Sequence, residues 1–418
     1  MPPSSPAERR ALLFLFVTVL VDAIGFGIVI PVFPGLIIGW TGASLGEAAK
    51  IAGGISFLHA SVQFLCGPVI GGLSDRFGRR PMLLASLIAF GADYLVMAFA
   101  PNLWWLVVAR IVAGVTGATF PTAYAYLADI SSPERRSANF GLIGMAFGFG
   151  FIIGPALGGL VAQFSPRAPF LLAAALAFAN ALYGWLVLPE SLAPENRRAF
   201  DLRRANPVGA LLRLRAAHPR VLALALTVFV WAMSYQSLYS VWNFFGIQRF
   251  GWTPAQVGWS LAAVGVSGAI VQGVFSRRLI PRFGQRRIII AGAVSAMVGY
   301  AIYAFATAGW MLYAGIAVSA LQGLVFPCLQ GLMSADVSPS EQGELQGSVT
   351  SMQALAAILG PPLMTTTFAA FSAERASVYF PGAPFLLSTG FAALALAMFF
   401  RATRGGGVPA RSKLTSRA

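Results

Sequence analysis

The chain has 418 residues and a formal net charge of +15, yet only 10% of its residues are charged and 57% are hydrophobic. A soluble domain carries about 25% charged residues, so this chain has too few to cover a surface that faces water. Together with a mean hydropathy of +0.74, this composition excludes a soluble protein and indicates an integral membrane protein.

Twelve apolar segments follow one another along the chain. Each is long enough to cross about 30 Å of hydrocarbon as a helix, and helices are expected because backbone polar groups find no water partners there. The predicted spans are residues 11–38, 48–72, 81–100, 103–127, 136–164, 168–188, 221–246, 254–276, 287–306, 309–334, 344–371 and 381–400. The first span contains Asp22 and has no small-residue cleavage site, so we expect it to be retained and not removed as a signal peptide.

The positive charges are unevenly distributed between the connections. Of the 29 Lys and Arg residues, 24 fall in one set of alternate loops and tails, four fall in the other set, and Arg110 lies within a span. An excess of Lys and Arg marks the cytoplasmic side. The distribution predicts that both termini are cytoplasmic, and it argues against a nucleic-acid partner because the charge follows the topology.

A charged hairpin recurs and divides the chain into two similar halves. The first copy covers residues 71–80, and five of its residues have counterparts 206 positions later. The counterparts are Leu279, Arg282, Phe283, Gly284 and Arg286. We therefore expect an N-terminal six-helix bundle at 1–190, a cytoplasmic linker at 191–220, and a C-terminal six-helix bundle with a short basic tail at 221–418.

Two acids, one histidine and one arginine lie well inside spans of the first half, away from the span ends, namely Asp22, Asp93, His59 and Arg110. Such groups are costly in hydrocarbon and are functional candidates by default. Arg110 does not shed its charge, so it needs an acid partner, and Asp22 and Asp93 are its natural counter-ions. All four are candidates for proton coupling. The alternatives are a structural role for Asp22 and a hydrogen-bonded packing role for His59.

The fifth span carries closely spaced small residues. They are Gly150, Gly154, Pro155, Gly158 and Gly159. Glycines four residues apart share one helix face, where another backbone is able to approach closely. The pattern predicts a packing groove, and the proline among the glycines also favours a kink in a helix that must flex.

The second half has no acid well inside its spans but is rich in amides and aromatic residues. Each such group is able to hydrogen-bond a neighbouring helix, but collectively they suit a polar, aromatic cavity for an organic molecule. With one residue from the second span, the cavity candidates are Gln63, Tyr235, Gln236, Tyr239, Trp242, Gln272, Gln330 and Gln353.

Motifs of catalysis and cofactor binding are missing. There is no glycine-rich nucleotide loop with a Lys-Ser/Thr pair, which argues against direct coupling to ATP. The two histidines, His59 and His218, have no metal ligands near them in the sequence. We therefore expect no enzyme activity, no cofactor and no metal.

Four stretches carry a resemblance to a known family. They are Gly71-x-Leu73-x-Asp75-Arg76-x-Gly78-Arg79-Arg80, Arg110-x-x-x-Gly114, Gly150-x-x-x-Gly154-Pro155-x-x-Gly158-Gly159 and Asp22-x-x-Gly25-x-Gly27-x-x-x-Pro31-x-x-Pro34. Together they resemble signatures of the major facilitator superfamily and of its drug–proton antiporter branch. The resemblance implies two pseudo-symmetric six-helix bundles around a central cavity that opens to alternate sides of the membrane.

Within that branch the chain resembles the bacterial tetracycline efflux proteins. Supporting stretches include Ser74 to Arg80, Gly114 to Thr119 and Phe250-Gly251-Trp252. The resemblance implies a protein of the bacterial inner membrane that exports an amphipathic, drug-like molecule, with a tetracycline-like compound as the first candidate, in exchange for protons. We expect it to act as a monomer. Where those exporters carry a histidine in helix 8 and an acid in helix 9, this chain has Gly268 and Ala296. Either coupling rests on the first half alone or the substrate is not tetracycline.

The resemblance also assigns a role to the charged hairpin. Seven residues, Gly71, Asp75, Arg76, Gly78, Arg79, Arg80 and Asp129, are expected to form a conformational gate. Asp75, Arg79 and Asp129 would form a charge cluster near the start of the eleventh span while the cytoplasmic side is closed. In the second half Pro281 stands where Asp75 stands in the first, so the gate would be one-sided. The alternative is that the arginines only fix topology.

Other functions remain open at this point. A facilitator or proton symporter that imports a small metabolite would keep the same fold, although the fifth-span pattern argues against it. A membrane sensor without transport is disfavoured because no sizeable soluble output domain is present.

Overall fold

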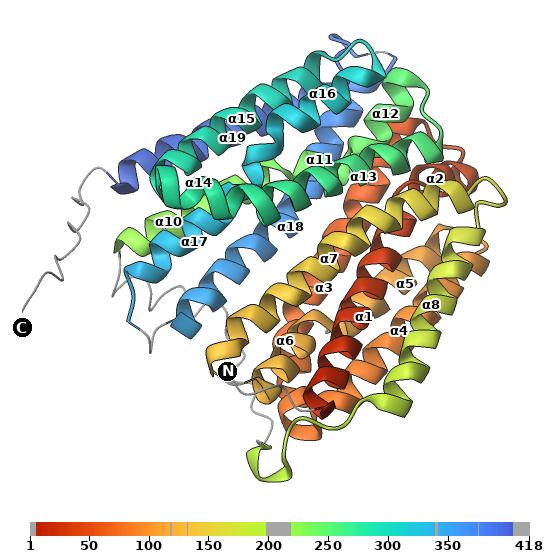
Figure 1. Ribbon diagram of the computed structural model, residues 1–418. Coiled ribbons are helices and arrows are strands. Elements are labelled where there is room, and N and C mark those ends of the chain that lie inside the picture. The colour runs from red at the N-terminus through yellow and green to blue at the C-terminus, as the bar shows by residue number, and fades with distance from the viewer. Residues whose placement is uncertain are drawn as a thin grey trace, which may run out of the picture.

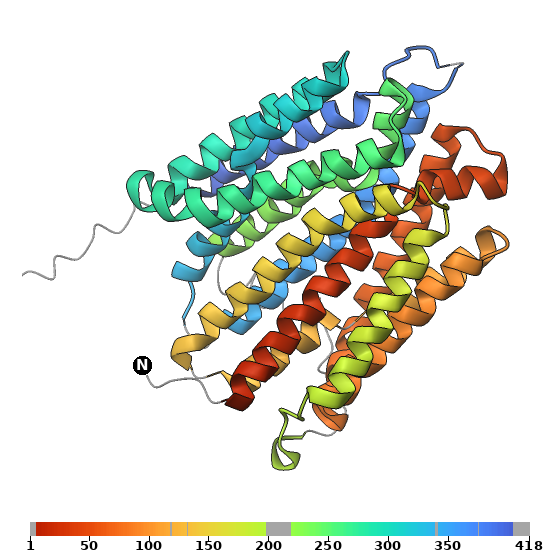
Figure 2. The same cartoon turned by 45° about the vertical axis from the view of Figure 1, so that its right-hand side comes forward.

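The computed structural model describes residues 6–117, 119–131, 133–197, 219–338, 342–374 and 376–403. Within these ranges the regular structure is helical and no strand occurs, as the sequence predicted. Figures 1 and 2 show two helix bundles side by side, the first drawn in red to yellow-green and the second in green to blue.

In the described residues the first bundle contains eight α-helical segments. They are α1 (Pro6–Val29), α2 (Phe33–Thr41), α3 (Leu45–Phe77), α4 (Arg79–Phe99), α5 (Leu103–Thr116), α6 (Thr119–Ile130), α7 (Pro133–Val161) and α8 (Ala168–Val187). A short 3₁₀ turn, η1 (Pro194–Asn196), follows them. The predicted linker at 191–220 is described only at its two ends, because residues 198–218 lie outside the described ranges.

The second bundle has more interruptions. Its segments are α10 (Pro219–Ser234), α11 (Gln236–Ser240), α12 (Trp242–Phe250), α13 (Pro254–Ile270), the π turn η3 (Val271–Phe275), α14 (Ser276–Phe283), α15 (Gln285–Phe305), α16 (Gly309–Ser319), the 3₁₀ turn η4 (Ala320–Leu324), α17 (Val325–Ala335), α18 (Gln342–Ser372) and α19 (Ala383–Thr403). The basic tail from residue 404 onward lies outside the described ranges.

Eleven helices of the described ranges are long and apolar enough to cross a membrane. The fourth predicted span, at 103–127, is the exception, because it is divided into α5 and α6 after Thr116. α5 alone is a shorter apolar helix. The twelve predicted spans therefore correspond to eleven long helices and one divided one.

Two further predicted spans are broken. The first, predicted to run to residue 38, ends as α1 at Val29, and the separate helix α2 begins at Phe33. Pro31 and Pro34 explain the break, because a proline in a helix interior removes a backbone hydrogen bond and clashes with the preceding turn. The seventh span is interrupted at Tyr235 and Val241, which leaves α11 as a five-residue segment.

The second long span of each half begins with the same local device. Ser44 caps α3 and accepts a hydrogen bond from the Glu47 amide at 3.3 Å, while Glu47 Oε2 accepts one from the Ser44 amide at 3.0 Å. Thr253 and Gln256 form the equivalent reciprocal pair at the start of α13. These capping boxes satisfy orphan amide groups at the helix start, and they fix corresponding helix ends in the two bundles.

The helix ends define two sides of the molecule. We call the side with the connections at Gly78 and Gly284 the hairpin end, and the side with the connections at Gly42 and Gly251 the far end. All four glycines have positive φ, between 63° and 111°, a backbone region that only glycine adopts without strain. They allow the chain to reverse between consecutive helices.

The two bundles contact each other through glycines near the far end. A Cβ atom added to Gly159 of α7 would lie 2.8 Å from the Cα of Ala255 in α13. One added to Gly258 of α13 would collide with the backbone of Pro155 in α7. A cross-bundle hydrogen bond, from Asn243 Nδ2 to the Ile30 carbonyl at 2.9 Å, lies in the same region. Small residues let helix backbones approach closely in a membrane.

Toward the hairpin end, glycines of α7 and α13, and also of α3 and α18, do not contact another helix closely. Glycines there have no atom within 4 Å of the position of an added Cβ. They are Gly67 and Gly71 of α3, Gly144 and Gly148 of α7, Gly268 and Gly273 of α13 and η3, and Gly347 of α18. The bundles are therefore packed together at the far end and lack the matching glycine contacts at the hairpin end.

This contrast predicts different effects of two glycine substitutions in α13. Gly258→Ala places a methyl group against the Pro155 backbone and should cost about 1–3 kcal/mol through overpacking. Gly268→Ala is the matched control, and it should be neutral or slightly stabilising because alanine favours the helix. Thermal unfolding of the purified variants and cross-linking between α7 and α13 at the far end measure both effects. Equal stability of the two variants would contradict this packing.

Candidate functional site

Arg110 of α5 and Asp93 of α4 form an ion pair inside the first bundle. Arg110 Nη2 donates to Asp93 Oδ2, and it also lies 3.0 Å from the sulfur of Met97. The Asp93 side chain is completely buried and that of Arg110 is 17% exposed. A charge in hydrocarbon has to be neutralised or hydrated, so this pair is the means by which Arg110 is tolerated. Asp93, one of the two predicted counter-ions, is thus confirmed as a partner of Arg110.

His59 and Gln63 connect α3 to α5. His59 Nδ1 donates to the Arg110 carbonyl oxygen at 3.0 Å, and Gln63 Nε2 donates to the Gly117 carbonyl at 3.3 Å. Gly114 permits this approach, because a Cβ there would lie 3.0 Å from the His59 carbonyl oxygen. In this structure His59 therefore holds the backbone of the arginine-bearing helix.

Asp22 of α1 borders the same region. Gly25, one turn later, faces the Tyr94 hydroxyl, which would lie 2.7 Å from an added Cβ. Tyr94 follows Asp93 in α4 and is within electrostatic range of Asp22 and Arg110. The ionisable groups that the sequence singled out in spans one, three and four thus surround Tyr94.

The charged hairpin forms a second polar cluster at the hairpin end. Arg79 Nη1 lies 2.6 Å from Asp75 Oδ1, and Arg79 Nε donates to Asp129 Oδ2 at 3.2 Å. The Ser191 hydroxyl donates to the same Asp129 oxygen at 3.1 Å. The structure therefore brings together Asp75, Arg79 and Asp129. The predicted approach to the start of the eleventh span involves residues 339–341, which lie outside the described ranges, and stays a prediction.

The other gate residues surround this cluster. The Arg76 guanidinium lies 5.2 Å from the ring of Phe77, and Arg80 Nη2 donates to the Trp185 carbonyl at 2.7 Å. Gly71 lies one turn before Asp75 on α3 and has open space beside it.

Sequence reasoning missed Glu190. Its carboxylate accepts hydrogen bonds from the backbone amides of Arg79 at 2.8 Å and Arg80 at 3.3 Å, at the N-terminus of α4. It occupies the space beside Gly78, where an added Cβ would collide with it. A carboxylate is stabilising at a helix N-terminus. The only sequence signal was an acid directly after Pro189, and the fold alone brings it to a helix start more than one hundred positions away.

The cavity candidates of the second half separate into two groups. Tyr239 is 52% exposed, although its ring packs edge-on against Phe151 of α7 at 6.0 Å and Tyr235 at 5.9 Å. Since Phe151 belongs to the other bundle, the exposed part of Tyr239 faces the space between the bundles. Tyr235 is within hydrogen-bonding reach of Gln353. Tyr235 and Gln353 therefore lie beside Tyr239 near the border of the bundles, and a role of these three residues in substrate binding stays a prediction.

Gln272 and Gln330 also remain accessible. Gln272 is exposed within the π turn η3, where its carbonyl accepts a hydrogen bond from the Ser276 hydroxyl. Gln330 Nε2 donates to Gln346 Oε1 at 2.7 Å and links α17 to α18. A π turn inside a helix often marks a functional site, so Gln272 keeps its place among the candidates.

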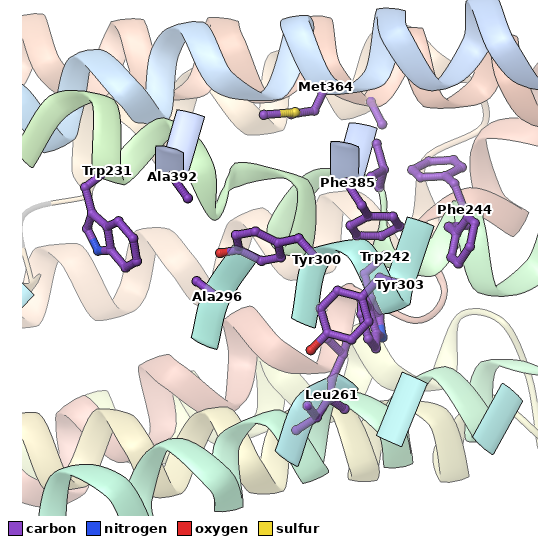
Figure 3. Close-up of a cluster of buried hydrophobic side chains, with 14 of the residues drawn as sticks. Trp231, Trp242, Phe244, Leu261, Ala296, Tyr300, Tyr303, Met364, Phe385 and Ala392 are labelled. Carbon is purple, nitrogen blue, oxygen red and sulfur yellow. The ribbon is translucent and has the colours of Figure 1, made fainter. Parts of the chain in front are cut away.

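Trp242 and Gln236 do not line a cavity, which corrects the prediction. The Trp242 ring is 1% exposed, and its indole N–H donates to Ser260 Oγ at 2.8 Å. Figure 3 shows it within an aromatic cluster with Tyr303 and Phe385, at centroid distances of 5.0 and 6.2 Å. Gln236 is 7% exposed and packs against Gly360. Both side chains lie next to the helix breaks at Tyr235 and Val241. The sequence predicted one continuous helix at 221–246 and therefore did not predict these breaks.

The two departures from the exporter pattern have different surroundings. Ala296 is fully buried in α15, within the cluster of Figure 3. Gly268 has open space beside it. A side chain would therefore be accommodated at position 268 without repacking, whereas an acid at 296 would enter an apolar core.

The glycines of the fifth span mostly serve packing. A Cβ added to Gly154 would lie 3.0 Å from the Cα of Gly27 in α1, and Gly150 and Gly158 contact α1 in the same way. Gly159 instead faces α13 of the other bundle, and Pro155 contacts both, with its ring against Gly27 of α1 and its carbonyl oxygen against Gly258 of α13. Of the two predicted roles, the packing groove is observed, and flexing of α7 stays a prediction.

The comparisons with known proteins agree with this architecture. The family model of the Major Facilitator Superfamily matches residues 15–361 and, in a second match, 248–415. The chain is 42% identical over 366 residues to the tetracycline resistance protein, class C, of Escherichia coli, an alignment that covers 87% of this chain and 91% of that protein. For the class G protein of Vibrio anguillarum the identity is 37% over 365 residues, with the same two shares.

A solved structure shares the fold. The chain superimposes on a bacterial homolog of the human lysosomal transporter Spinster with a TM-score of 0.77, at 18% identity, over 96% of this chain and 98% of that chain. The long apolar helices and this fold mark a multi-pass membrane protein. The chain belongs to the major facilitator superfamily, and within it the chain is similar to bacterial tetracycline resistance proteins. The family predicted from the sequence motifs is confirmed, and its members are transporters, not enzymes.

The ion pair predicts an asymmetric double-mutant cycle. Asp93→Asn leaves the Arg110 cation without its carboxylate and should destabilise the protein by about 3–5 kcal/mol. Arg110→Gln should cost less, because an isolated carboxylate is able to take up a proton whereas arginine keeps its charge. The double variant should lose less stability than the two single variants together. Thermal unfolding of the four purified proteins measures the cycle, and strictly additive losses would contradict a direct pair.

Proposed function

We propose that this protein exports an amphipathic, drug-like molecule in exchange for protons, with a tetracycline-like compound as the first candidate. The observation that carries the proposal is the group of intramembrane charges in the first bundle, in which Asp93 and Arg110 pair and Asp22 borders Tyr94 beside them. The relatives that are named tetracycline resistance proteins support the choice of substrate.

The two acids are assigned different parts. Asp93 is fully buried and already holds Arg110, so it keeps the fixed charge in place. Asp22 is only half-buried, so it is the acid that exchanges a proton with water. Protonation of Asp22 changes the net charge around Tyr94 by one, which is a large perturbation in a medium of low dielectric constant. This change is the proposed link between proton binding and movement of the bundles.

The substrate is proposed to bind where the two bundles meet. Phe147 stacks on Phe151 at 6.2 Å in α7, Phe151 contacts Tyr239, and Tyr239 contacts Tyr235 in the second bundle. This row of rings crosses from one bundle to the other. Aromatic contacts contribute about 0.5–1.5 kcal/mol each beyond area burial, and they suit a substrate with a planar ring system.

Transport is proposed to follow alternating access. With the hairpin end in the cytoplasm, as the positive charges predict, the described state is closed outside by the glycine contacts of α7 and α13 and lacks those contacts inside. The cluster of Asp75, Arg79 and Asp129 is proposed to engage the start of α18 when the cytoplasmic end closes. Both termini are then cytoplasmic, and the protein acts as a monomer in a bacterial inner membrane.

Everted membrane vesicles test the proposed function. Vesicles that hold the wild-type protein and acidify their lumen should accumulate tetracycline, and a protonophore should abolish the accumulation. Asp22→Asn should insert normally but lose uphill accumulation, whereas Asp22→Glu, the matched control, should keep part of it. Uphill export by Asp22→Asn with the wild-type pH dependence would give Asp22 a structural role only. Depletion of the substrate from the lumen would identify an importer.

The charged hairpin predicts a change in conformational balance. Asp75→Asn leaves the number of basic residues unchanged, so insertion should be normal. Transport should be lost, and a cysteine at Gly347, where space is open, should become more reactive from the hairpin side because the closed state is weakened. The measurement is maleimide labelling of Gly347→Cys in a background with Cys66→Ser. Unchanged transport and labelling would leave the hairpin with a topological role alone.

A further inference from the structure

A groove runs along the outer face of the second bundle. It has a volume of about 530 Å³ and lies between α15 and α16. Both views place these helices on the side of the second bundle that faces away from the first. Its lining residues are Arg287, Ile290, Ala291, Val294, Ser295, Val298 and Val318. It is therefore separate from the space between the bundles.

The groove has one charged end and an apolar length. Five of the seven lining residues are apolar, and the Ser295 hydroxyl is already used, because it donates to the Val318 carbonyl at 2.7 Å. Arg287 stands at the hairpin end, in the first turn of α15. From Arg287 to Val298 the helix rises about 16 Å at 1.5 Å per residue. Half of a hydrocarbon core of about 30 Å is nearly the same length, so the groove extends through one leaflet.

Arg287 belongs to a set of basic residues for which the described part of the chain shows no acid partner. Arg277, Arg278, Arg282, Arg286 and Arg287 are all exposed on α14 and the start of α15. The sequence has no Asp or Glu between Arg220 and Asp336, and the Asp336 carboxylate lies 3.4 Å from Arg220. No acid of the same helices is therefore able to neutralise these arginines.

The equivalent hairpin of the first bundle is different. There Arg79 is neutralised by Asp75 and Asp129, and Glu190 caps the helix that follows. In the second copy Pro281 replaces the aspartate, and the N-cap of α15 is Gly284, which has no side chain to cap the first amides. Free amides at a helix N-terminus attract phosphate. The second hairpin has thus kept the arginines of the first, but in the described residues it has no carboxylates in the places of Asp75, Asp129 and Glu190.

We propose that this groove binds an anionic phospholipid of the leaflet at the hairpin end, with an acyl chain along α15 and the phosphate at Arg287. An anionic lipid matches both parts of the groove. Its acyl chain fits the apolar lining, and its negative headgroup fits Arg287. A basic residue close to an anionic membrane surface contributes attraction of this kind. The binding does not depend on the transport activity proposed above.

Lipid binding by the purified full-length protein tests the proposal. The probe is fluorescent phosphatidylglycerol, compared with phosphatidylcholine that has the same chains, titrated into the detergent-solubilised protein. Arg287→Gln should weaken phosphatidylglycerol binding about 5-fold, which corresponds to about 1 kcal/mol. Arg278→Gln is the matched control, because it removes the same charge from a neighbouring exposed position that does not line the groove.

A second pair of variants tests the acyl-chain part. Ala291→Trp fills the groove and should displace the lipid, whereas Leu182→Trp, at a 57% exposed position on α8 of the other bundle, should not. Size-exclusion profiles and melting temperatures verify that all variants are folded. Equal weakening by Arg287→Gln and Arg278→Gln would show diffuse attraction and overturn the proposal. Equal affinity for the two lipids, or unchanged binding to Ala291→Trp, would overturn it as well.

Discussion

The structure depends on how a charge is accommodated in a medium without water. Arg110 cannot lose its proton, so its helix position is possible only because Asp93 on the adjacent helix is completely buried against it. His59 then holds the carbonyl of the same arginine from a third helix. One obligatory charge therefore ties α3, α4 and α5 together. The first bundle acquires a polar centre, whereas the second has no acid at all from Arg220 to Asp336.

Close packing of helix backbones at glycines holds the two bundles together at the far end. In hydrocarbon there is little hydrophobic gain from helix association, so close contact over small residues supplies much of it. Gly159 and Gly258 provide such contact at the far end, while Gly148 and Gly268 of the same two helices lie open. Close packing between the bundles is therefore concentrated at one end of α7 and α13. The contact between Tyr239 and Phe151 also joins the two bundles.

The two hairpins show how a repeat diverges under different surroundings. Both keep a positive-φ glycine, at Gly78 and Gly284, because the chain must reverse there. In the first copy the arginine is enclosed by carboxylates from α3 and α6. In the second, the corresponding surface is left cationic beside an apolar groove. The same topology signal thus serves an internal contact in one bundle and an external one in the other.

The sequence by itself determined the membrane class, the two halves, most of the helix ranges and the intramembrane charges. The reason is that hydropathy, charge and repeats are properties of residue order and do not depend on contacts between distant residues. Four motifs were enough to predict the family. Only the tertiary structure decided that Arg110 pairs with Asp93, that Trp242 belongs to a core, and that Glu190 caps α4. The physical reason is that these outcomes depend on helix breaks at Tyr235 and Gly117 and on contacts between residues far apart in the chain, neither of which is encoded in local periodicity.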